Sequence, residues 1–334
     1  LCQYHWLDNY YSCIIFYDKK GRETTMNLII CYTPLQVLIA EKIIELHPNE
    51  RFYGVMLCSV KNKKFDYYAE RLSLKCEQFF SMHQRIERFH LLKQIISLKC
   101  KFTNVKFDKV FVASINDIQI QFILSAIKFD GIYTFDDGTA NIVQSSVYYM
   151  PEPNTFIRRS INSFFRNKYS VEKLKVLSKQ HYTIYPDFPN IIENTMVIDL
   201  FNAQKNQDEK LANQPITHIL LGQPVYLECD KNVRLAEKVI KEFNIDLYLA
   251  HPREQYKLDN VNYIDTPLIL EDYLVQEFSH KPCRIYTYFS SAVLNIKNPN
   301  IEIVALRIET ERPDFIECYN LLDKVGIKII DIRE

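Results

Sequence analysis

The sequence predicts an α/β fold with two domains, each built on a parallel sheet. Two blocks of the chain alternate short apolar runs with stretches of helical apolar spacing, and a polar segment separates the blocks. Short runs that are apolar throughout are typical of parallel strands covered by helices on both faces. The length of 334 residues also exceeds the ~100–200 residues usual for one domain.

The first block is expected to span residues 26–150. Its expected strands are 27–32, 52–58, 107–113 and 131–135, and its expected helices are 35–46, 66–76, 86–99 and 117–128. The residues before Met26 are too polar for a signal peptide and lack the apolar length of a membrane span. The charged side chains that interrupt them are Lys19, Lys20, Arg22 and Glu23. We therefore expect residues 1–25 to be an extension outside the fold.

The second block is expected to span residues 216–334, after a connecting segment at 151–215. Its expected strands are 218–222, 247–251, 262–264, 284–289, 301–306 and 327–332. Its expected helices are 232–243, 270–278 and 313–323, with a further helical stretch at 292–296. Two Rossmann-like domains that face each other across a central cleft make the GT-B architecture, and this is the predicted fold class.

The charge balance argues against nucleic acid as a partner. Basic and acidic side chains number 41 each, so no global field favours a polyanion. A local basic stretch comprises Arg158, Arg159, Arg166 and Lys168, with Phe156, Ile157, Phe164 and Phe165 interleaved. Such a stretch is either a solvated face or a surface that rests on anionic lipid.

The nine cysteines are scattered, and no CxxC pair or Cys/His cluster has zinc spacing. Cys31, Cys58 and Cys283 lie in apolar runs, as small buried side chains do. This usage predicts a reducing, cytoplasmic location rather than a secreted disulfide framework, with peripheral contact to the inner membrane as an added option.

Unusual polar residues follow the expected strands at their carboxyl ends. They are Asp136-Asp137-Gly138, Gly222-Gln223-Pro224, His251-Pro252-Arg253 and Ser290-Ser291. Open α/β sheets bind ligands beyond the carboxyl ends of their strands. The sequence therefore predicts a ligand site built from these four elements.

These motifs, in this order, resemble the bacterial lipooligosaccharide sialyltransferases of glycosyltransferase family 52. The resemblance runs from about Met26 to the C terminus and includes Phe135-Asp-Asp-Gly-Thr139, Leu220-Leu-Gly-Gln-Pro224, Glu271-Asp-Tyr273 and Tyr286-Thr-Tyr-Phe-Ser290. It implies a metal-independent, inverting enzyme with no cofactor. The donor it implies is CMP-N-acetylneuraminic acid (CMP-Neu5Ac), and the acceptor is a terminal galactose of a glycolipid or oligosaccharide, usually linked α2,3.

Sialyl transfer calls for an acid beside the departing phosphate, and His251 is the candidate because histidine titrates near neutrality. Ser290 and Ser291 are expected to contact the phosphate, and Glu271 the ribose hydroxyls. The full set of residues expected to bind CMP-Neu5Ac is Gly222, Gln223, Pro224, Pro252, Arg253, Leu268, Ile269, Glu271, Ser290 and Ser291.

The base that takes the proton of the acceptor hydroxyl has three candidates. Relatives place a carboxylate directly after the Gly-x-Pro turn, but here Val225 follows and the loop is longer. Glu228 or Asp230 is the carboxylate that this loop would deliver, and Asp137 is the rival. Asp136 and Gly138 support the Asp137 motif. Because the two aspartates are adjacent rather than alternating, they do not form a metal-binding DxD motif, and we expect no metal.

Two other functions remain open at this point. One is a different glycosyltransferase on the same scaffold, such as a glucosyltransferase, and the other is a non-catalytic module that binds a glycan or a nucleotide sugar. The sequence also leaves the oligomeric state open, with a homodimer as one option.

Overall fold

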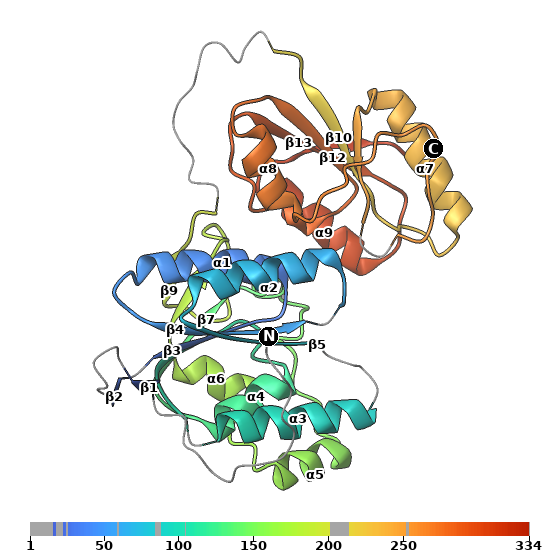
Figure 1. Cartoon of the computed structure of the whole chain (residues 1–334). Coiled ribbons are helices and arrows are strands. Elements are labelled where there is room, and N and C mark those ends of the chain that lie inside the picture. The colour runs from blue at the N-terminus through green and yellow to red at the C-terminus, as the bar shows by residue number, and fades with distance from the viewer. Residues whose placement is uncertain are drawn as a thin grey trace. The chain divides into compact units, whose positions relative to one another are not determined.

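The computed structural model describes residues 16–17, 23–24, 26–58, 60–83, 88–103, 105–200, 214–251 and 254–333. The chain divides into two compact units, Leu1–Ile198 and Asp199–Glu334. Each unit contains one parallel sheet flanked by helices (Figure 1). The predicted α/β class, with one parallel sheet in each of two units, is confirmed.

The sheet of the first unit has seven parallel strands in the order β5-β4-β3-β6-β7-β8-β9. They are β3 (Asn27–Cys31), β4 (Phe52–Cys58), β5 (Gln78–His83), β6 (Lys106–Val112), β7 (Lys128–Phe135), β8 (Ser178–Thr183) and β9 (Thr195–Val197). The chain builds outward from β3 on one side and then crosses to β6 on the other. Ligands of such sheets bind where the strand order reverses, here between β3 and β6.

Helices cover both faces of this sheet, which is why β3 and β4 are buried along their whole length. The helices are α1 (Pro34–Leu46), α2 (Lys63–Lys75), α3 (Arg88–Phe102), α4 (Ile118–Ala126), α5 (Phe156–Phe164) and α6 (Val171–Leu177). In Figure 1, α1 and α2 lie on one face, and α3 and α4 on the other. Helix α1 begins directly after β3 because the Thr33 hydroxyl accepts from the Gln36 amide and Pro34 occupies the first turn.

The segment 151–215, predicted to connect two domains, contributes structure to the first unit. It contains α5, α6, β8 and β9, and β8 extends the sheet by pairing with β7. The strand signal is weak because β8 reads Ser-Lys-Gln-His-Tyr-Thr, and its buried His181 and Thr183 are polar. Residues 201–213 lie outside the described residues.

Of the predicted extension 1–25, the structure describes only β1 (Phe16–Tyr17) and β2 (Glu23–Thr24). These pair with each other in an antiparallel sheet of their own. The rest of the predicted extension lies outside the described residues.

The sheet of the second unit has five parallel strands in the order β11-β10-β12-β13-β14. They are β10 (Thr217–Leu221), β11 (Leu247–Leu249), β12 (Cys283–Thr287), β13 (Ile301–Arg307) and β14 (Lys328–Asp331). The strand order reverses between β10 and β12. The predicted strand 262–264 is a single bridge between Tyr248 and Tyr263 instead.

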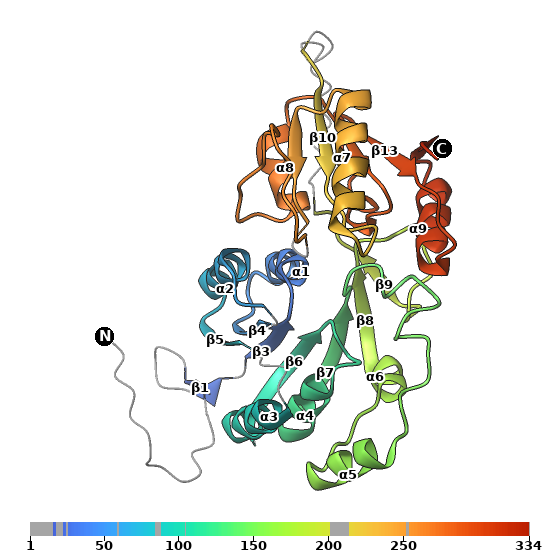
Figure 2. The ribbon, with the colours of Figure 1, turned by 90° about the vertical axis from the view of Figure 1, so that its right-hand side faces the viewer.

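The helices of this unit are α7 (Cys229–Phe243), α8 (Leu270–Phe278) and α9 (Pro313–Lys324). In Figures 1 and 2, strand β10 lies between α7 and α8. The helical stretch predicted at 292–296 is a short 3₁₀ helix, Ser291–Val293. Among the helices that the structure describes, none is long and apolar enough to cross a membrane.

Candidate active site

The turn after β10 is tied to the turn after β12 by one side chain. Gln223 Oε1 accepts a hydrogen bond from the Thr287 hydroxyl at 3.1 Å. The same oxygen accepts from the amides of Tyr288 and Phe289, at 3.1 and 3.2 Å. The predicted elements Gly222-Gln223-Pro224 and Ser290-Ser291 are therefore neighbours at the point where the strand order reverses.

Ser290 and Ser291 lie at this edge and are partly exposed. The Ser290 amide donates to the Thr287 hydroxyl at 3.1 Å, and Ser290 Oγ accepts from the Ala292 amide at 3.3 Å. Their hydroxyls sit on a turn whose backbone is held at both ends. Hydroxyl donors in such a turn suit a phosphate oxygen.

Gly222 is packed so closely that no side chain fits. Its amide donates to the Leu249 carbonyl at 2.8 Å, which brings the turn against the end of β11. A Cβ on Gly222 would lie 2.5 Å from Glu254 Oε2 and would also overlap the Tyr248 hydroxyl. Glycine is required here by close approach rather than by its backbone angles.

His251 follows β11 by two residues and is partly exposed. Its amide donates to Glu254 Oε2 at 3.3 Å, and the Glu254 amide donates to the His251 carbonyl at 2.9 Å. The predicted donor-binding residues Pro252 and Arg253 lie outside the described residues.

Glu254 was not among the predicted site residues. Its carboxylate also accepts from the Tyr248 hydroxyl at 2.9 Å. Burial raises the pKa of Glu254 above its usual value, although these donors oppose the shift. The available signal was its place three residues after His251, the spacing at which an acidic side chain reaches back to an amide in a capping box.

The start of α8 carries the other predicted donor-binding residues. Leu268 is buried, and its amide donates to the Thr266 hydroxyl at 3.2 Å. Ile269 is the residue before the helix, and Glu271 lies buried in its first turn. A buried carboxylate near a helix amino terminus is favourably placed with respect to the helix dipole.

The two loop carboxylates lie where α7 begins. Glu228 is the N-cap position and is exposed, and it pairs with Lys231 at 3.0 Å. The hydrogen bond from Lys231 lowers the pKa of Glu228, which makes this carboxylate a weaker base. Asp230 is exposed in the first turn of the same helix.

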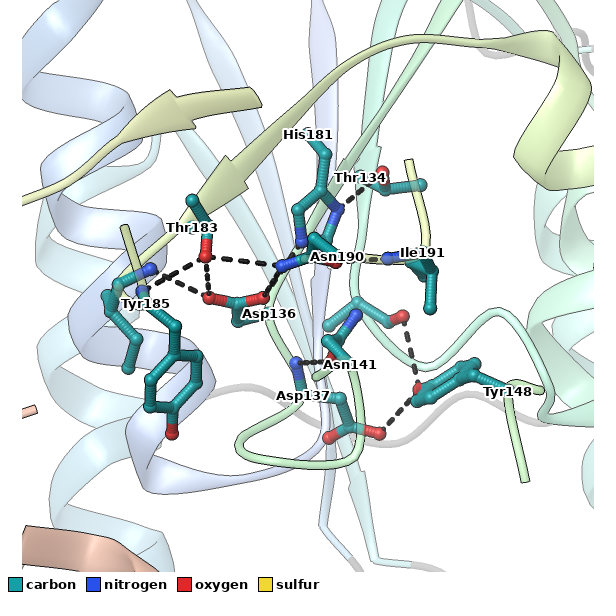
Figure 3. A network of polar contacts seen from close by, with 12 residues as sticks. Thr134, Asp136, Asp137, Asn141, Tyr148, His181, Thr183, Tyr185, Asn190 and Ile191 are labelled. Carbon is teal, nitrogen blue, oxygen red and sulfur yellow. Dashed lines mark hydrogen bonds and ion pairs between the residues drawn. The ribbon is translucent and has the colours of Figure 1, made fainter. Parts of the chain in front are cut away.

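In the first unit, Asp136 is fully buried and accepts from four donors (Figure 3). Its Oδ1 is paired with His181 Nε2 at 2.8 Å and accepts from Asn190 at 3.0 Å. Its Oδ2 accepts from the Thr183 hydroxyl and the Ile184 amide, both at 2.7 Å. All of these partners come from β8 and the segment after it, so Asp136 fastens β8 to the sheet.

Asp137 points into a different set of contacts, at the reversal between β3 and β6. Its carboxylate accepts from Gln36 on α1, from Ser114 after β6 at 3.1 Å and from the Tyr148 hydroxyl at 2.7 Å. Burial raises the pKa of Asp137 despite these three donors, and the charge of Asp117 adds to the shift. Gly138 follows with a φ of 75°, which turns the chain sharply.

The described residues contain no group of three His, Cys, Asp or Glu side chains arranged to hold a metal ion. The polar groups at the strand ends are hydrogen-bond donors and single carboxylates instead.

A model of glycosyltransferase family 52 matches residues 49–310 of the chain. This chain belongs to glycosyltransferase family 52. It is 57% identical, over 92% of its length and 100% of the relative, to the CMP-N-acetylneuraminate:β-galactoside α-2,3-sialyltransferase of Pasteurella multocida. It is 40% identical, over 91% of its length and 99% of the relative, to the N-acetyllactosaminide α-2,3-sialyltransferase of Haemophilus influenzae. The Neisseria meningitidis enzyme of the same name is 34% identical over 94% of this chain and 87% of that one.

Solved structures show more distant similarity. MurG of Acinetobacter baumannii matches with a TM-score of 0.46 and 14% identity, over 92% of this chain and 86% of that one. A UDP-glucosyltransferase of Polygonum tinctorium matches with a TM-score of 0.48 and 10% identity, over 91% and 85%. The family assignment confirms the resemblance found in the sequence motifs.

Replacing Gly222 with alanine tests the close packing in this family 52 chain. Because the new Cβ would overlap Tyr248 and Glu254, we expect Gly222→Ala to lower the free energy of unfolding by about 1–3 kcal/mol, as overpacking does. Thermal and urea unfolding measure the change. The control is Gly131→Ala, whose Cβ would first meet the flexible end of Lys179. Equal stability of the two variants would contradict the packing argument.

Proposed function

We propose that this enzyme transfers N-acetylneuraminic acid from CMP-Neu5Ac to the galactose of a β-galactoside, forming an α2,3 linkage. The observation that carries the proposal is the 57% identity to the Pasteurella multocida sialyltransferase over that enzyme's whole length. The two further relatives, named as acting on N-acetyllactosaminide with the same linkage, support it.

The proposed chemistry takes place at the edge formed by β10, β11 and β12. The bond from the anomeric carbon of the sugar to the phosphate oxygen breaks, and the phosphate keeps the electron pair. The acceptor hydroxyl oxygen forms the new bond from the opposite face, which inverts the anomeric centre. Donors that stabilise the charge growing on the phosphate lower the barrier, because they act more strongly on the transition state than on bound donor.

We assign the donor-side roles to the second unit. His251 gives a proton to the departing phosphate, Ser290 and Ser291 hold its other oxygens, and Glu271 accepts from the ribose hydroxyls. The proposal is supported by the contacts of Gln223, which bring the Ser290 turn beside the β10 turn. A monophosphate held by neutral donors and an imidazole requires no metal, so we propose a metal-independent reaction.

For the base we favour Asp230. Both loop carboxylates follow β10, at the same sheet edge as Ser290. Glu228 is engaged by Lys231, which lowers its pKa, whereas no ion pair of Asp230 is found among the described residues. Asp137 stays the rival because burial raises its pKa and so strengthens it as a base. The three hydrogen bonds that Asp137 accepts are equally consistent with a structural role, in which it orders the loops of the first unit.

The acceptor is proposed to be the terminal galactose of lipooligosaccharide or a related glycan, bound by the first unit.

A cytoplasmic location is supported by the free thiols of Cys31, Cys58, Cys76, Cys100, Cys229, Cys283 and Cys318 in the described part of the chain.

We also propose that α5 contacts an anionic membrane surface. Phe156, Ile157 and Phe164 are 75%, 69% and 79% exposed, and no residue of α5 is buried. The neighbouring Arg159 and Arg166 are exposed cations. Exposed aromatic residues beside cations are the composition of interfacial helices, and a lipid-borne acceptor makes the location useful.

The activity is tested by incubating the enzyme with CMP-Neu5Ac and lactose in the presence of EDTA. We expect sialyllactose of α2,3 linkage, identified by mass and by a linkage-specific sialidase, at the same rate with and without the chelator. UDP-glucose as donor should give no product. Glucosyl transfer, or dependence on a divalent cation, would reject the proposal.

Acid and base are tested by substitution. His251→Ala should lower kcat by about 10²–10⁴-fold, the usual effect of losing a positioned acid. Asp230→Asn should be similarly severe, because a neutral amide cannot take the acceptor proton, while Glu228→Gln should be mild. His280→Ala, an exposed histidine at the other end of β12, is the control.

Donor binding separates these roles, since CMP affinity should survive in the Asp230→Asn variant. If Asp230→Asn keeps its kcat while Asp137→Asn loses it at unchanged melting temperature, the base is Asp137.

Membrane contact is tested by sedimentation with vesicles of phosphatidylglycerol and phosphatidylcholine, against vesicles of phosphatidylcholine alone. The double variant Phe156→Ser, Phe164→Ser should lose binding to the anionic vesicles and keep its rate on lactose. Leu74→Ser is the control, because Leu74 is 80% exposed on α2. Equal binding of the double variant and the control would remove α5 from the contact.

A further inference from the structure

We propose that Glu254 is a positioning residue for His251: its carboxylate fixes the histidine main chain and joins it to the turn after β10. The proposal rests on the acid role of His251 proposed above. Glu254 lies outside the four strand-end motifs, and it connects His251 to the Gly222-Gln223-Pro224 motif.

The first step is the pair of hydrogen bonds between His251 and Glu254. The Glu254 amide donates to the His251 carbonyl at 2.9 Å, and the His251 amide donates to Glu254 Oε2 at 3.3 Å. The same two residues thus exchange a backbone and a side-chain hydrogen bond, as in a capping box. The His251 backbone therefore depends on the Glu254 carboxylate.

The second step is the anchor of that carboxylate. The Tyr248 hydroxyl donates to Glu254 Oε2 at 2.9 Å, and Tyr248 is fully buried within β11. Its ring packs edge-to-face on Tyr263, with centroids 5.3 Å apart. Because Tyr248 belongs to β11 and its ring is packed, its hydroxyl gives the carboxylate a fixed partner. His251 and Glu254 are therefore anchored to the sheet.

The third step is the contact with the turn after β10. Glu254 Oε2 lies 2.5 Å from the position that a Cβ of Gly222 would occupy, so the carboxylate packs against that residue. The Tyr256 hydroxyl donates to the Gln223 carbonyl at 3.4 Å, from the same segment. Through Gln223 this turn reaches the Ser290 turn. One carboxylate therefore sets the histidine relative to the groups proposed to hold the phosphate.

The other oxygen supports a role beyond folding. Glu254 Oε1 is buried and has no hydrogen-bond partner among the described residues. Burial also raises the pKa of this carboxyl group. Buried polar atoms in native structures are usually hydrogen-bonded, so an oxygen without a partner among the described residues needs an explanation, and a role at the site is one.

The test is a double-mutant cycle on the full chain, measured with CMP-Neu5Ac and lactose. Glu254→Ala should lower kcat by about 10²-fold, the effect of misplacing a reacting group by about 1 Å, with little change in KM for the donor. Glu254→Gln retains an acceptor oxygen for both donors and should keep most of the turnover. In the His251→Ala background, Glu254→Ala should cause no further loss, because its effect passes through the histidine.

Tyr248→Phe removes only the anchor and should show a smaller loss of kcat that also vanishes in the His251→Ala background. It decides the proposal if Glu254→Ala fails to fold. Tyr319→Phe is the control, since it also loses a buried hydroxyl, bonded to Leu306 and Ile308, in the same unit.

A normal kcat in Glu254→Ala would overturn the positioning role. So would an equally large further loss of kcat when Glu254→Ala or Tyr248→Phe is added to His251→Ala. Failure of the unaltered enzyme to transfer sialic acid would instead reject the proposed function.

Discussion

The backbone amides just beyond the end of a parallel strand need hydrogen-bond partners, and one glutamine supplies them at each strand-order reversal. In the second unit, β12 ends at Thr287, and the next two amides would have no strand to pair with. Gln223 Oε1, from the end of β10, accepts from both. Because buried amides rarely stay unpaired, this one oxygen sets the path of the chain into Ser290.

The first unit solves the same problem with Gln36. Its Oε1 accepts from the Tyr32 amide at 2.6 Å just after β3, while its Nε2 donates to Ser114 after β6 and to Asp137 after β7. A glutamine side chain carries both a donor and an acceptor. It can therefore join a loop that offers an amide donor to loops that offer acceptor oxygens. The ends of three strands are thereby held together where a ligand of this sheet would bind.

Apolar runs such as Asn27–Cys31 and Phe52–Cys58 were predictable as strands because both faces are buried, and burial dictates composition. Strand β8 was hidden because the partner that compensates its buried His181 and Thr183 is Asp136, more than forty residues earlier. The strand expected at 262–264 has the right composition, but only Tyr263 forms a bridge. Periodicity records burial and contains no information on such long-range partners.

The same reasoning separates what was predictable in the site. The strand-end motifs stood out because Gly222 and Gln223 break apolar runs. Glu254 did not stand out, because its role depends on accepting a hydrogen bond from the His251 amide. Sequence spacing alone does not distinguish a glutamate with this contact from an exposed one.

Asp136 and Asp137 show how one motif divides into two functions. Adjacent residues at a strand end point to opposite sides, so one carboxylate meets β8 and the other meets the strand-order reversal. Burial raises the folded-state pKa of Asp137 above the ordinary value of about 3.9. As pH rises, Asp137 therefore loses its proton in the unfolded chain before it does so in the folded protein. Between the unfolded-state pKa and the higher folded-state pKa, rising pH reduces the free energy of unfolding. Glu254 in the second unit has the same sign of shift. Two carboxyls whose ionisation opposes folding thus lie at the carboxyl edges of the two sheets, where perturbed groups mark functional sites.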